Sequence, residues 1–330
     1  MGKLALTLAC PAYDRVQALR DGTVTCEGVD LNVIPLVVEE VFWRQLRHAE
    51  FDVAECSLSS YVMARSKGDE RFVAIPVFPS RFFRHGCIFI NTRKGIARPE
   101  DLKGKVVGVP EYQVTAAVWI RGMLQDDYGV YPGDVLWRSG GEEEPGRVDK
   151  IPMNLPPHIS CQPIPADKTL SRMLDEGEID ALVAPRAPSC FVNGSPNVAR
   201  LFPNYREVEE DYYHRTGIFP IMHTVIIRRE IYEANRWVAM SLYKAFREAK
   251  EVAVRNYSIM AALYVTLPWL IHEVERTRQL MGEDWWPYGL EPNRHALETF
   301  LRYHHEQGLS VRRMTVEELF APETLDEFKI

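Results

Sequence analysis

The stretch VFPSRFFRHGCIFIN, Val77 to Asn91, decides how the rest of this sequence is interpreted. An apolar run precedes it and a second one, Cys87 to Ile90, stands near its end, and both are bounded by Pro and Gly, which is typical of buried strands. Between the two runs lie three cations, Arg81, Arg84 and His85. Cations at a strand end of an open α/β sheet can face a small anion. The alternative is a solvated loop in which arginine serves solubility.

Length and charge limit the classes of partner. A chain of 330 residues can bury a large core and favours two lobes over one. The formal net charge of -7 disfavours nucleic acids and anionic membranes as partners. An anionic ligand would therefore have to be held by local cations.

The N-terminal residues MGKLALTLACPAYDR contain only a short apolar run, and no run of about 18 apolar residues occurs anywhere. The sequence therefore predicts a cytoplasmic protein that does not span a membrane. The six cysteines lack CxxC spacing, so neither a disulfide framework nor a zinc site is expected. The thiols are predicted to be reduced and mostly buried.

Strand and helix patterns alternate over the first 60 residues, and this alternation predicts a parallel sheet. Strands are expected at Leu4 to Ala9 and at Phe51 to Ala54, each followed by polar residues. Right-handed crossovers bring the ends of such strands to one edge of the sheet. The residues expected at this edge are Asp14, Arg15, Glu55, Ser57 and Arg81.

A second βα unit begins near Thr92, with a strand at Lys105 to Val109. The helix that follows starts near Tyr112 and Thr115, and an exposed helix N-terminus after a strand is suited to anions. The spacing matches neither GxGxxG nor a Walker motif, so it does not indicate a nucleotide. Further on, FPIMHTVII contains a lone His223, and such a histidine is more often a satisfied core residue than a catalyst.

The C-terminal third has the apolar periodicity of helices. Helices are expected at 235–256, 259–267, 271–281 and 293–308. Between the last two lies WWPYGLEPNR, Trp285 to Arg294, which is either a packed plug or a pocket wall.

Several motifs resemble known proteins. DLKGKVVGVP and LDEGEIDALVAP resemble the second lobe of type II periplasmic binding proteins. ACPAYDR, VFPSRFFRHGCIFIN, GVPEYQVTAAVWIRGML, YHRTGIFPIMHTVIIRRE and WPYGLEPNR together resemble the 4,5-dihydroxyphthalate decarboxylase family, cytoplasmic enzymes of bacterial phthalate degradation. The resemblance covers nearly the whole chain.

The resemblance implies an α/β, two-lobed type II periplasmic-binding-protein-like fold with an interlobe cleft and a helical C-terminal tail. The strand pattern resumes after His223, so lobe I is predicted at 1–90 plus 223–330 and lobe II at 91–222. Strands around Phe89 and Thr224 should join the lobes, with the ligand between them.

The implied activity is cofactor-independent decarboxylation of a hydroxylated aromatic dicarboxylate, with 4,5-dihydroxyphthalate giving protocatechuate and CO2. A hydroxyl para to the leaving carboxylate can push electrons into the ring, so no electron-sink cofactor is expected. No metal-ligating residues are predicted, and the sequence leaves open whether a metal assists. The predicted partner is this small aromatic dicarboxylate, without nucleic acid or membrane. The sequence leaves the oligomeric state open, and a homo-oligomer is compatible with it.

This chemistry needs a base near the phenol, an acid for the ring carbon and cations for the remaining carboxylate. The residues that could supply the cations are Arg15, Arg81, Arg84 and Arg186, with Tyr112 and Thr115 at the helix start as further ligands. His85 and His223 are the candidate proton donors, because imidazole titrates near neutral pH. Asp14 or Glu55 could accept the phenolic proton.

Two other classes remain open. A cytoplasmic solute-binding protein for a small carboxylate would use the same cations without turnover. A metal-dependent hydrolase or decarboxylase would need clustered ligands, and His304-His305 is the only close histidine pair in the sequence. Neighbouring residues on a helix point in different directions, which disfavours that pair as a metal site.

Overall fold

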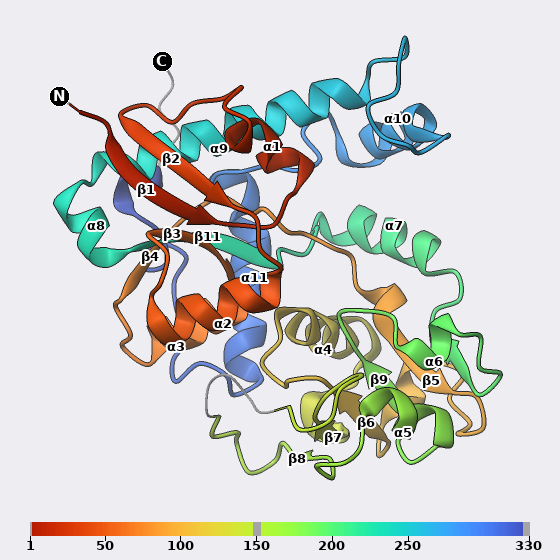
Figure 1. Ribbon diagram of the computed structural model, residues 1–330. Coiled ribbons are helices and arrows are strands. Elements are labelled where there is room, and N and C mark those ends of the chain that lie inside the picture. The colour runs from red at the N-terminus through yellow and green to blue at the C-terminus, as the bar shows by residue number, and fades with distance from the viewer. Residues whose placement is uncertain (1, 148–152, 326–330) are drawn as a thin grey trace. The chain divides into compact units, whose positions relative to one another are not determined.

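The computed structural model describes residues 2–147 and 153–325 (Figure 1). The chain forms two compact units. Unit 1 is Met1–Arg81, His223–Leu297 and Thr315–Ile330, and unit 2 is Phe82–Met222 and Glu298–Met314. The chain thus passes between the units at four places. These units differ from the predicted lobes in two segments, because residues 82–90 and 298–314 cluster with unit 2.

Unit 1 contains a five-stranded sheet in the order β2-β1-β3-β11-β4. Its elements are β1 (Leu4–Ala9), α1 (Asp14–Arg20), β2 (Val29–Ile34), α2 (Val38–His48), β3 (Val53–Ser57), α3 (Leu58–Ser66), β4 (Phe72–Ile75), β11 (His223–Arg228), α8 (Arg229–Ala234), α9 (Trp237–Tyr257), α10 (Leu270–Met281) and short 3₁₀ turns at Glu291–Asn293 and Pro322–Thr324. Strand β1 is parallel to β2 and β3, whereas β11 is antiparallel to β3 and β4. The expected parallel sheet is therefore mixed, because β11 comes from the returning chain rather than from a βα crossover.

Unit 2 contains a six-stranded sheet in the order β10-β5-β9-β6-β7-β8. Its elements are β5 (Ile88–Asn91), β6 (Val106–Val109), α4 (Thr115–Tyr128), β7 (Leu136–Ser139), β8 (Cys161–Pro163), α5 (Leu170–Glu176), β9 (Ala181–Val183), α6 (Ser189–Val192), β10 (Val198–Arg200), α7 (Tyr205–Thr216) and 3₁₀ turns at His85–Cys87, Pro99–Leu102 and Pro132–Asp134. Strand β5 runs antiparallel to β9 and β10, while β6 is parallel to β7 and β9. Strand β7 is parallel to β8.

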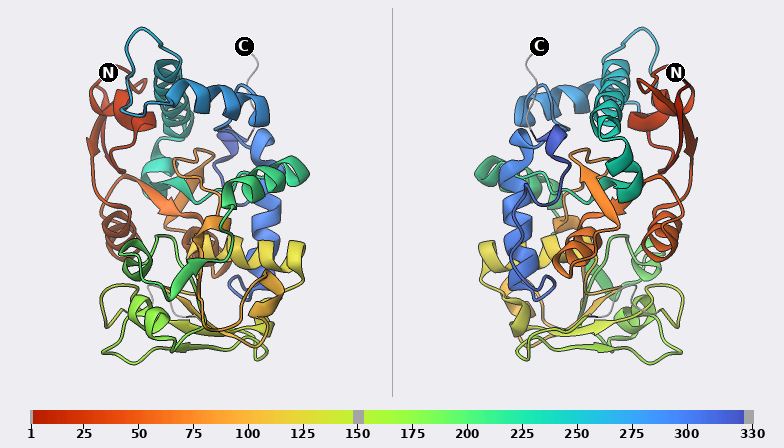
Figure 2. Two further views of the ribbon diagram at one scale, coloured as in Figure 1. Left: turned by 90° about the vertical axis from the view of Figure 1, so that its right-hand side faces the viewer. Right: turned by 90° about the vertical axis from the view of Figure 1, so that its left-hand side faces the viewer.

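The predicted helical tail is present as α9, α10 and α11 (Arg294–Glu306). The long helix α9 packs along α1 (Figures 1 and 2). The helix expected at 259–267 is wrong, because the chain between α9 and α10 consists of turns and all its residues are exposed. Nine residues without a partner surface are too few to form a stable helix on their own. No described helix has the length and apolar character needed to cross a bilayer.

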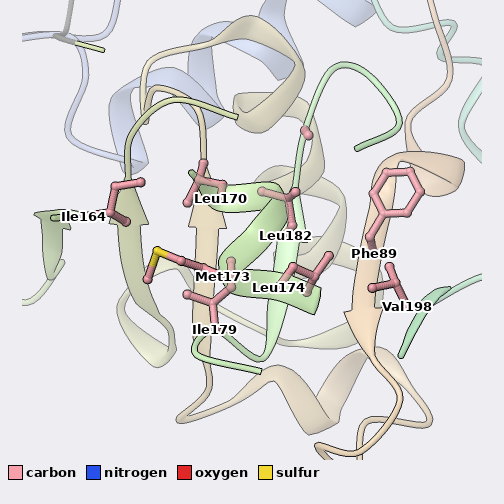
Figure 3. Close-up of a cluster of buried hydrophobic side chains, with 9 residues drawn as sticks. Phe89, Ile164, Leu170, Met173, Leu174, Ile179, Leu182 and Val198 are labelled. Atoms are coloured by element: carbon pink, nitrogen blue, oxygen red, sulfur yellow. The ribbon is translucent and has the colours of Figure 1, made fainter. Parts of the chain in front are cut away.

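Apolar residues predicted as strands and helices form the cores. In unit 2 the aliphatic side chains of α5 pack between the sheet and its flanking segments (Figure 3). This cluster contains Phe89, Ile164, Leu170, Met173, Leu174, Ile179, Leu182, Ala184 and Val198. A smaller cluster in unit 1 joins α2 to β1 and β3 through Ala9, Val41, Phe42, Phe51 and Ala54. These cores hold the strand ends in place. The polar residues of the candidate site lie on these strands or directly after them.

Helix α11 begins in unit 1, and from Glu298 onward it belongs to unit 2. There it lies so close to α4 that a Cβ atom at Gly122 would come within 2.1 Å of the Tyr303 ring. The Tyr303 hydroxyl also donates to Asp126 at 2.6 Å, and Gln307 accepts a hydrogen bond from the buried Arg121 at 2.8 Å. These contacts explain why residues 298–314 pack with unit 2 rather than with the rest of the tail.

Candidate functional site

A carboxylate–imidazole pair lies on the two central strands of unit 1. Glu55 of β3 is opposite Val225 of β11, and His223 is two residues earlier on β11, so both side chains project from the same face of the sheet. The His223 Nδ1 atom is 2.6 Å from Oε1 of Glu55. Glu55 is fully buried, whereas 16% of the His223 side chain is exposed. With Nδ1 bound to the carboxylate, Nε2 is the ring nitrogen left for a bound molecule.

Two further donors from the end of β1 reach Glu55. The Tyr13 hydroxyl donates to Oε1 at 3.2 Å, and the Cys10 thiol lies 3.5 Å from Oε2. Burial, followed by the Glu55 charge, raises the pKa of both groups, so both stay protonated at neutral pH. The Glu55 carboxylate therefore accepts hydrogen bonds from three neighbours, an arrangement that compensates the burial of its charge.

Arg15 lies beside this cluster. Its guanidinium stacks 3.9 Å from the centre of the Tyr13 ring and 4.7 Å from that of Trp286. Its Nε donates to the carbonyl of Pro79, and Nη1 is 3.1 Å from Asp14. Asp14, at the start of α1, is 45% exposed and does not contact Glu55. Of the two predicted bases, Glu55 is therefore the one that the structure joins to a histidine.

Arg81 is 5% exposed and holds the aromatic loop 285–294. Its Nη2 donates to the Pro287 carbonyl at 2.7 Å and to the side-chain oxygen of Asn293. The Trp286 indole donates to the Phe78 carbonyl at 2.9 Å, so the loop packs directly on the segment that begins at Val77. This packing agrees with the plug interpretation of the aromatic loop.

Tyr288 of the same loop is 4% exposed. Its hydroxyl is one of the buried polar atoms that find no hydrogen-bond partner among the described residues. Burial raises its pKa, and the charges of Arg15, Arg81 and Glu55 act on it, so it lies in the same part of unit 1. A buried, protonated hydroxyl of this kind is available to donate to a ligand.

Two predicted residues from the stretch Val77 to Asn91 belong to unit 2. Arg84 is buried and donates to the Pro185 carbonyl at 3.1 Å, with Met222 and Cys87 sulfur atoms as its other neighbours. His85 is 1% exposed, and its ring packs against Phe202 and Tyr212 with centroids 5.5 and 5.2 Å away. Burial lowers the pKa of His85 to about 4, so it is neutral at physiological pH.

The remaining predicted ligands are also in unit 2 and have different surroundings. Tyr112 is fully buried, with the Arg121 guanidinium 3.7 Å from its ring centre. Thr115 is the first residue of α4 and is 3% exposed, so this helix start is not the open one that the sequence predicted. Arg186 follows β9 and is exposed.

Three residues near Glu55, His223 and Arg15 were not predicted from the sequence: Cys10, Tyr13 and Tyr288. The first two lie in ACPAYDR, directly after a predicted strand, so their position alone could have suggested them. Tyr288 gave no such signal, because only the packing of its loop brings it near the arginines. In residues 2–147 and 153–325, no three His, Cys, Asp or Glu side chains form a group that could hold a metal ion.

Comparisons with known proteins identify one relative that matches the whole chain and another that matches part of it. A 4,5-dihydroxyphthalate decarboxylase of Comamonas testosteroni is 44% identical over 330 residues, which is 100% of both chains. A 4,5-dihydroxyphthalate decarboxylase of Pseudomonas putida is 46% identical over 213 residues, covering 64% of this chain and 83% of the relative. A search against protein-family models found no match.

Solved structures with the same fold are much more distant in sequence. The aliphatic sulphonate binding protein SsuA of Escherichia coli has a TM-score of 0.53 at 12% identity, covering 98% of this chain and 99% of that one. A sulfonate-binding protein of Methylobacillus flagellatus also has a TM-score of 0.53, at 14% identity, with 98% and 94% covered. The two-lobed periplasmic-binding-protein-like fold implied by the motifs is thus confirmed. Full-length identity of 44% goes further and shows that this chain belongs to the 4,5-dihydroxyphthalate decarboxylase family.

Proposed function

We propose that this protein removes CO2 from 4,5-dihydroxyphthalate and forms protocatechuate. The observation that carries the proposal is the pair of a buried Glu55 and a partly exposed His223, 2.6 Å apart, in a member of this family. A carboxylate bound to one imidazole nitrogen sets the ring so that the other nitrogen can exchange a proton with a substrate.

The reaction needs three proton movements: the phenol loses a proton to a base, the ring carbon gains one, and the phenolate oxygen regains one after CO2 has left. Removing the proton of the hydroxyl para to one carboxylate raises the electron density at the ring carbon that bears this carboxylate. A proton added to this carbon gives an intermediate that loses CO2. The C–C bond then breaks, its electron pair returns to the ring, and the aromatic system is restored. Overall the carboxylate is replaced by one proton, with no net oxidation or reduction.

In this proposal His223 gives the proton to the ring carbon through Nε2. Glu55 holds the imidazole by Nδ1 and stabilises its protonated form, while Cys10 and Tyr13 keep the carboxylate in place. Arg15 and Arg81, with the Tyr288 hydroxyl, would bind the carboxylate that stays on the ring. Arg84, Arg186, Tyr112 and Thr115 remain predicted ligands, and His85 a predicted alternative acid.

Incubating the purified protein with 4,5-dihydroxyphthalate tests the proposal. We expect CO2 and protocatechuate in equal amounts, and in D2O one deuterium on the ring carbon that lost its carboxylate. Phthalate is the matched control: it has both carboxylates but no hydroxyl to push electrons, so it should bind without reacting.

The same assay distinguishes the other two classes of protein. Binding of 4,5-dihydroxyphthalate without release of CO2 would contradict the decarboxylase proposal and favour a solute-binding protein. Turnover that a chelator abolishes and an added divalent cation restores would show a metal-dependent reaction. Turnover that a chelator leaves unchanged supports the mechanism given above.

Binding of the second carboxylate is tested by replacing Arg81 with Lys and, separately, Arg84 with Lys. If the guanidinium binds a carboxylate through two hydrogen bonds, the substitution should weaken dicarboxylate binding about 10-fold or more. The reason is that lysine carries a single ammonium group and cannot form this paired contact. Binding of a dihydroxybenzoate with one carboxylate should change far less. Calorimetric titration with both ligands measures the difference. Equal losses for the two ligands, together with a lower melting temperature, would mean that the arginine stabilises the fold instead.

A further inference from the structure

Lys250 is a buried cation on the apolar face of α9. Its side chain is 6% exposed, whereas Lys244 on the same helix is exposed to solvent. The buried neighbours of Lys250 along this face include Phe246 and Ala249. An apolar side chain would suit such a position, because lysine is almost never buried unless its ammonium group has partners. Those partners therefore explain why a lysine is present.

The partners of Lys250 lie in or directly before the aromatic loop 285–294. Its Nζ atom donates to Oδ1 of Asp284 at 2.8 Å and to the carbonyl of Trp286 at 3.1 Å. The same atom is 5.3 Å from the centre of the Tyr288 ring, within the range of a cation–π contact. Lys250 thus holds the first half of the aromatic loop against α9.

Two of these loop residues also belong to the candidate site. The Trp286 ring centre is 4.7 Å from the Arg15 guanidinium, on the side of the site. The Tyr288 hydroxyl is buried where the charges of Arg15 and Arg81 act on it. Arg15, Arg81 and Tyr288 are the groups that would bind the carboxylate that stays on the ring. The position of the loop therefore decides how these three groups are arranged.

Adjacent carbonyls of the loop are bound by two different cations. Arg81 binds the Pro287 carbonyl at 2.7 Å, and Lys250 binds the Trp286 carbonyl. We propose that Lys250 is a positioning residue: it does not touch the substrate, but it fixes Trp286 and Tyr288 and thereby sets the affinity for the dicarboxylate. The inference rests on the proposed function for the identity of that ligand.

Lys250→Met tests this role, because methionine keeps an unbranched apolar stem, suits a helix and removes only the ammonium group. The dissociation constants of 4,5-dihydroxyphthalate and of phthalate should rise about 10-fold or more, as for the loss of a charged hydrogen bond. The value of kcat should fall less than about 3-fold, because Glu55 and His223 stay in place. Calorimetric titration and steady-state kinetics measure the two effects.

Three further variants show whether the charge of Lys250 is what matters. Lys250→Arg keeps a cation with several donors and should recover most of the affinity. Asp284→Ala removes one partner at a position that is 58% exposed, so the fold should persist and the affinity should fall in the same direction by less. Lys244→Met is the matched control, and it should bind both ligands as the wild type does.

Hydrogen exchange of the loop gives a readout that needs no ligand. The Gly289 amide donates to the Pro76 carbonyl at 2.8 Å, so its exchange reports whether the loop stays packed. In Lys250→Met, peptides that cover residues 284–290 should exchange about 10-fold faster or more, because the loop opens locally. Peptides of β1 and β3 should exchange as in the wild type.

These results separate the role of Lys250 from the decarboxylase proposal. A wild type that binds the dicarboxylates without releasing CO2, together with weaker binding by Lys250→Met, would contradict only the decarboxylase proposal. Unchanged exchange of the loop, or faster exchange with unchanged affinity, would overturn the positioning role alone. Faster exchange throughout unit 1 with a lower melting temperature would do the same, since Lys250 would then stabilise the core. A wild type that binds neither dicarboxylate would overturn both.

Discussion

Replacing His223 with Asn is expected to lower kcat by about 100-fold to 10,000-fold, the usual contribution of a general acid. Asparagine can still donate a hydrogen bond to Glu55, so the buried carboxylate keeps a partner and the fold should persist. The substrate should bind with a nearly unchanged dissociation constant, because the proton transfer is made only in the transition state. Single-turnover kinetics and equilibrium titration together measure the two effects.

His85→Asn is the matched comparison for His223→Asn. His85 is buried among aromatic rings, so an amide there should cost stability, about 1–3 kcal/mol, and leave kcat nearly unchanged. The pKa of His85 is about 4 in the folded protein and 6.5 ordinarily, so the unfolded chain binds its proton first. The wild type should therefore lose stability as the pH falls from about 6.5 to about 4, and the variant should lack this part of the loss. If His85→Asn alone abolishes turnover, the acid is His85 and the role given to His223 is wrong.

Glu55→Gln should have the second large effect. Glutamine has nearly the shape of glutamate and can still accept from Tyr13 or His223, but it carries no charge. An imidazolium formed at His223 then has no carboxylate beside it. We expect kcat to fall at least about 100-fold, as when the carboxylate partner of a catalytic histidine is removed. The pH profile of kcat should also change, which loss of stability alone would not produce.

Asp14→Asn serves as the control for Glu55→Gln, since Asp14 was the other carboxylate predicted as a base. Asp14 is 45% exposed and its described partner is Arg15. Substitutions at such positions usually change stability by no more than about 0.5 kcal/mol, and turnover should remain close to that of the wild type. A loss in Asp14→Asn as large as that in Glu55→Gln would mean that Asp14 also takes part in turnover, and that the pair of Glu55 and His223 is not sufficient.

Much of the fold was predictable because the strands are buried and bounded by clear turns. Strands β1, β3 and β6 and helices α9 and α11 lie close to the predicted ranges. The helix expected at 259–267 failed for a physical reason: apolar periodicity indicates a helix only where another surface covers the apolar face. The antiparallel direction of β11 was likewise hidden, since short apolar runs contain no information about the strand they pair with.

The site was predictable in part. Grouping Arg15, Glu55 and Arg81 at strand ends needed only the rule for crossovers, and all three belong to unit 1. The pairing of Glu55 with His223 was not predictable, because it joins residues 168 positions apart through the insertion of β11 beside β3. For the same reason His223 could not be preferred to His85 from the sequence alone, although their surroundings in the structure are quite different.

The place of β11 in the sheet also has a consequence for biosynthesis. Strand β11 separates β3 from β4, yet it is made about 150 residues after them. While the ribosome produces unit 2, β3 and β4 each expose an open edge, and such edges can pair with other chains. Pairing over so long a stretch of chain is also slow. The half-made protein is therefore the stage at which chaperones matter most, and a chain that ends before His223 should accumulate as aggregate rather than as a folded fragment.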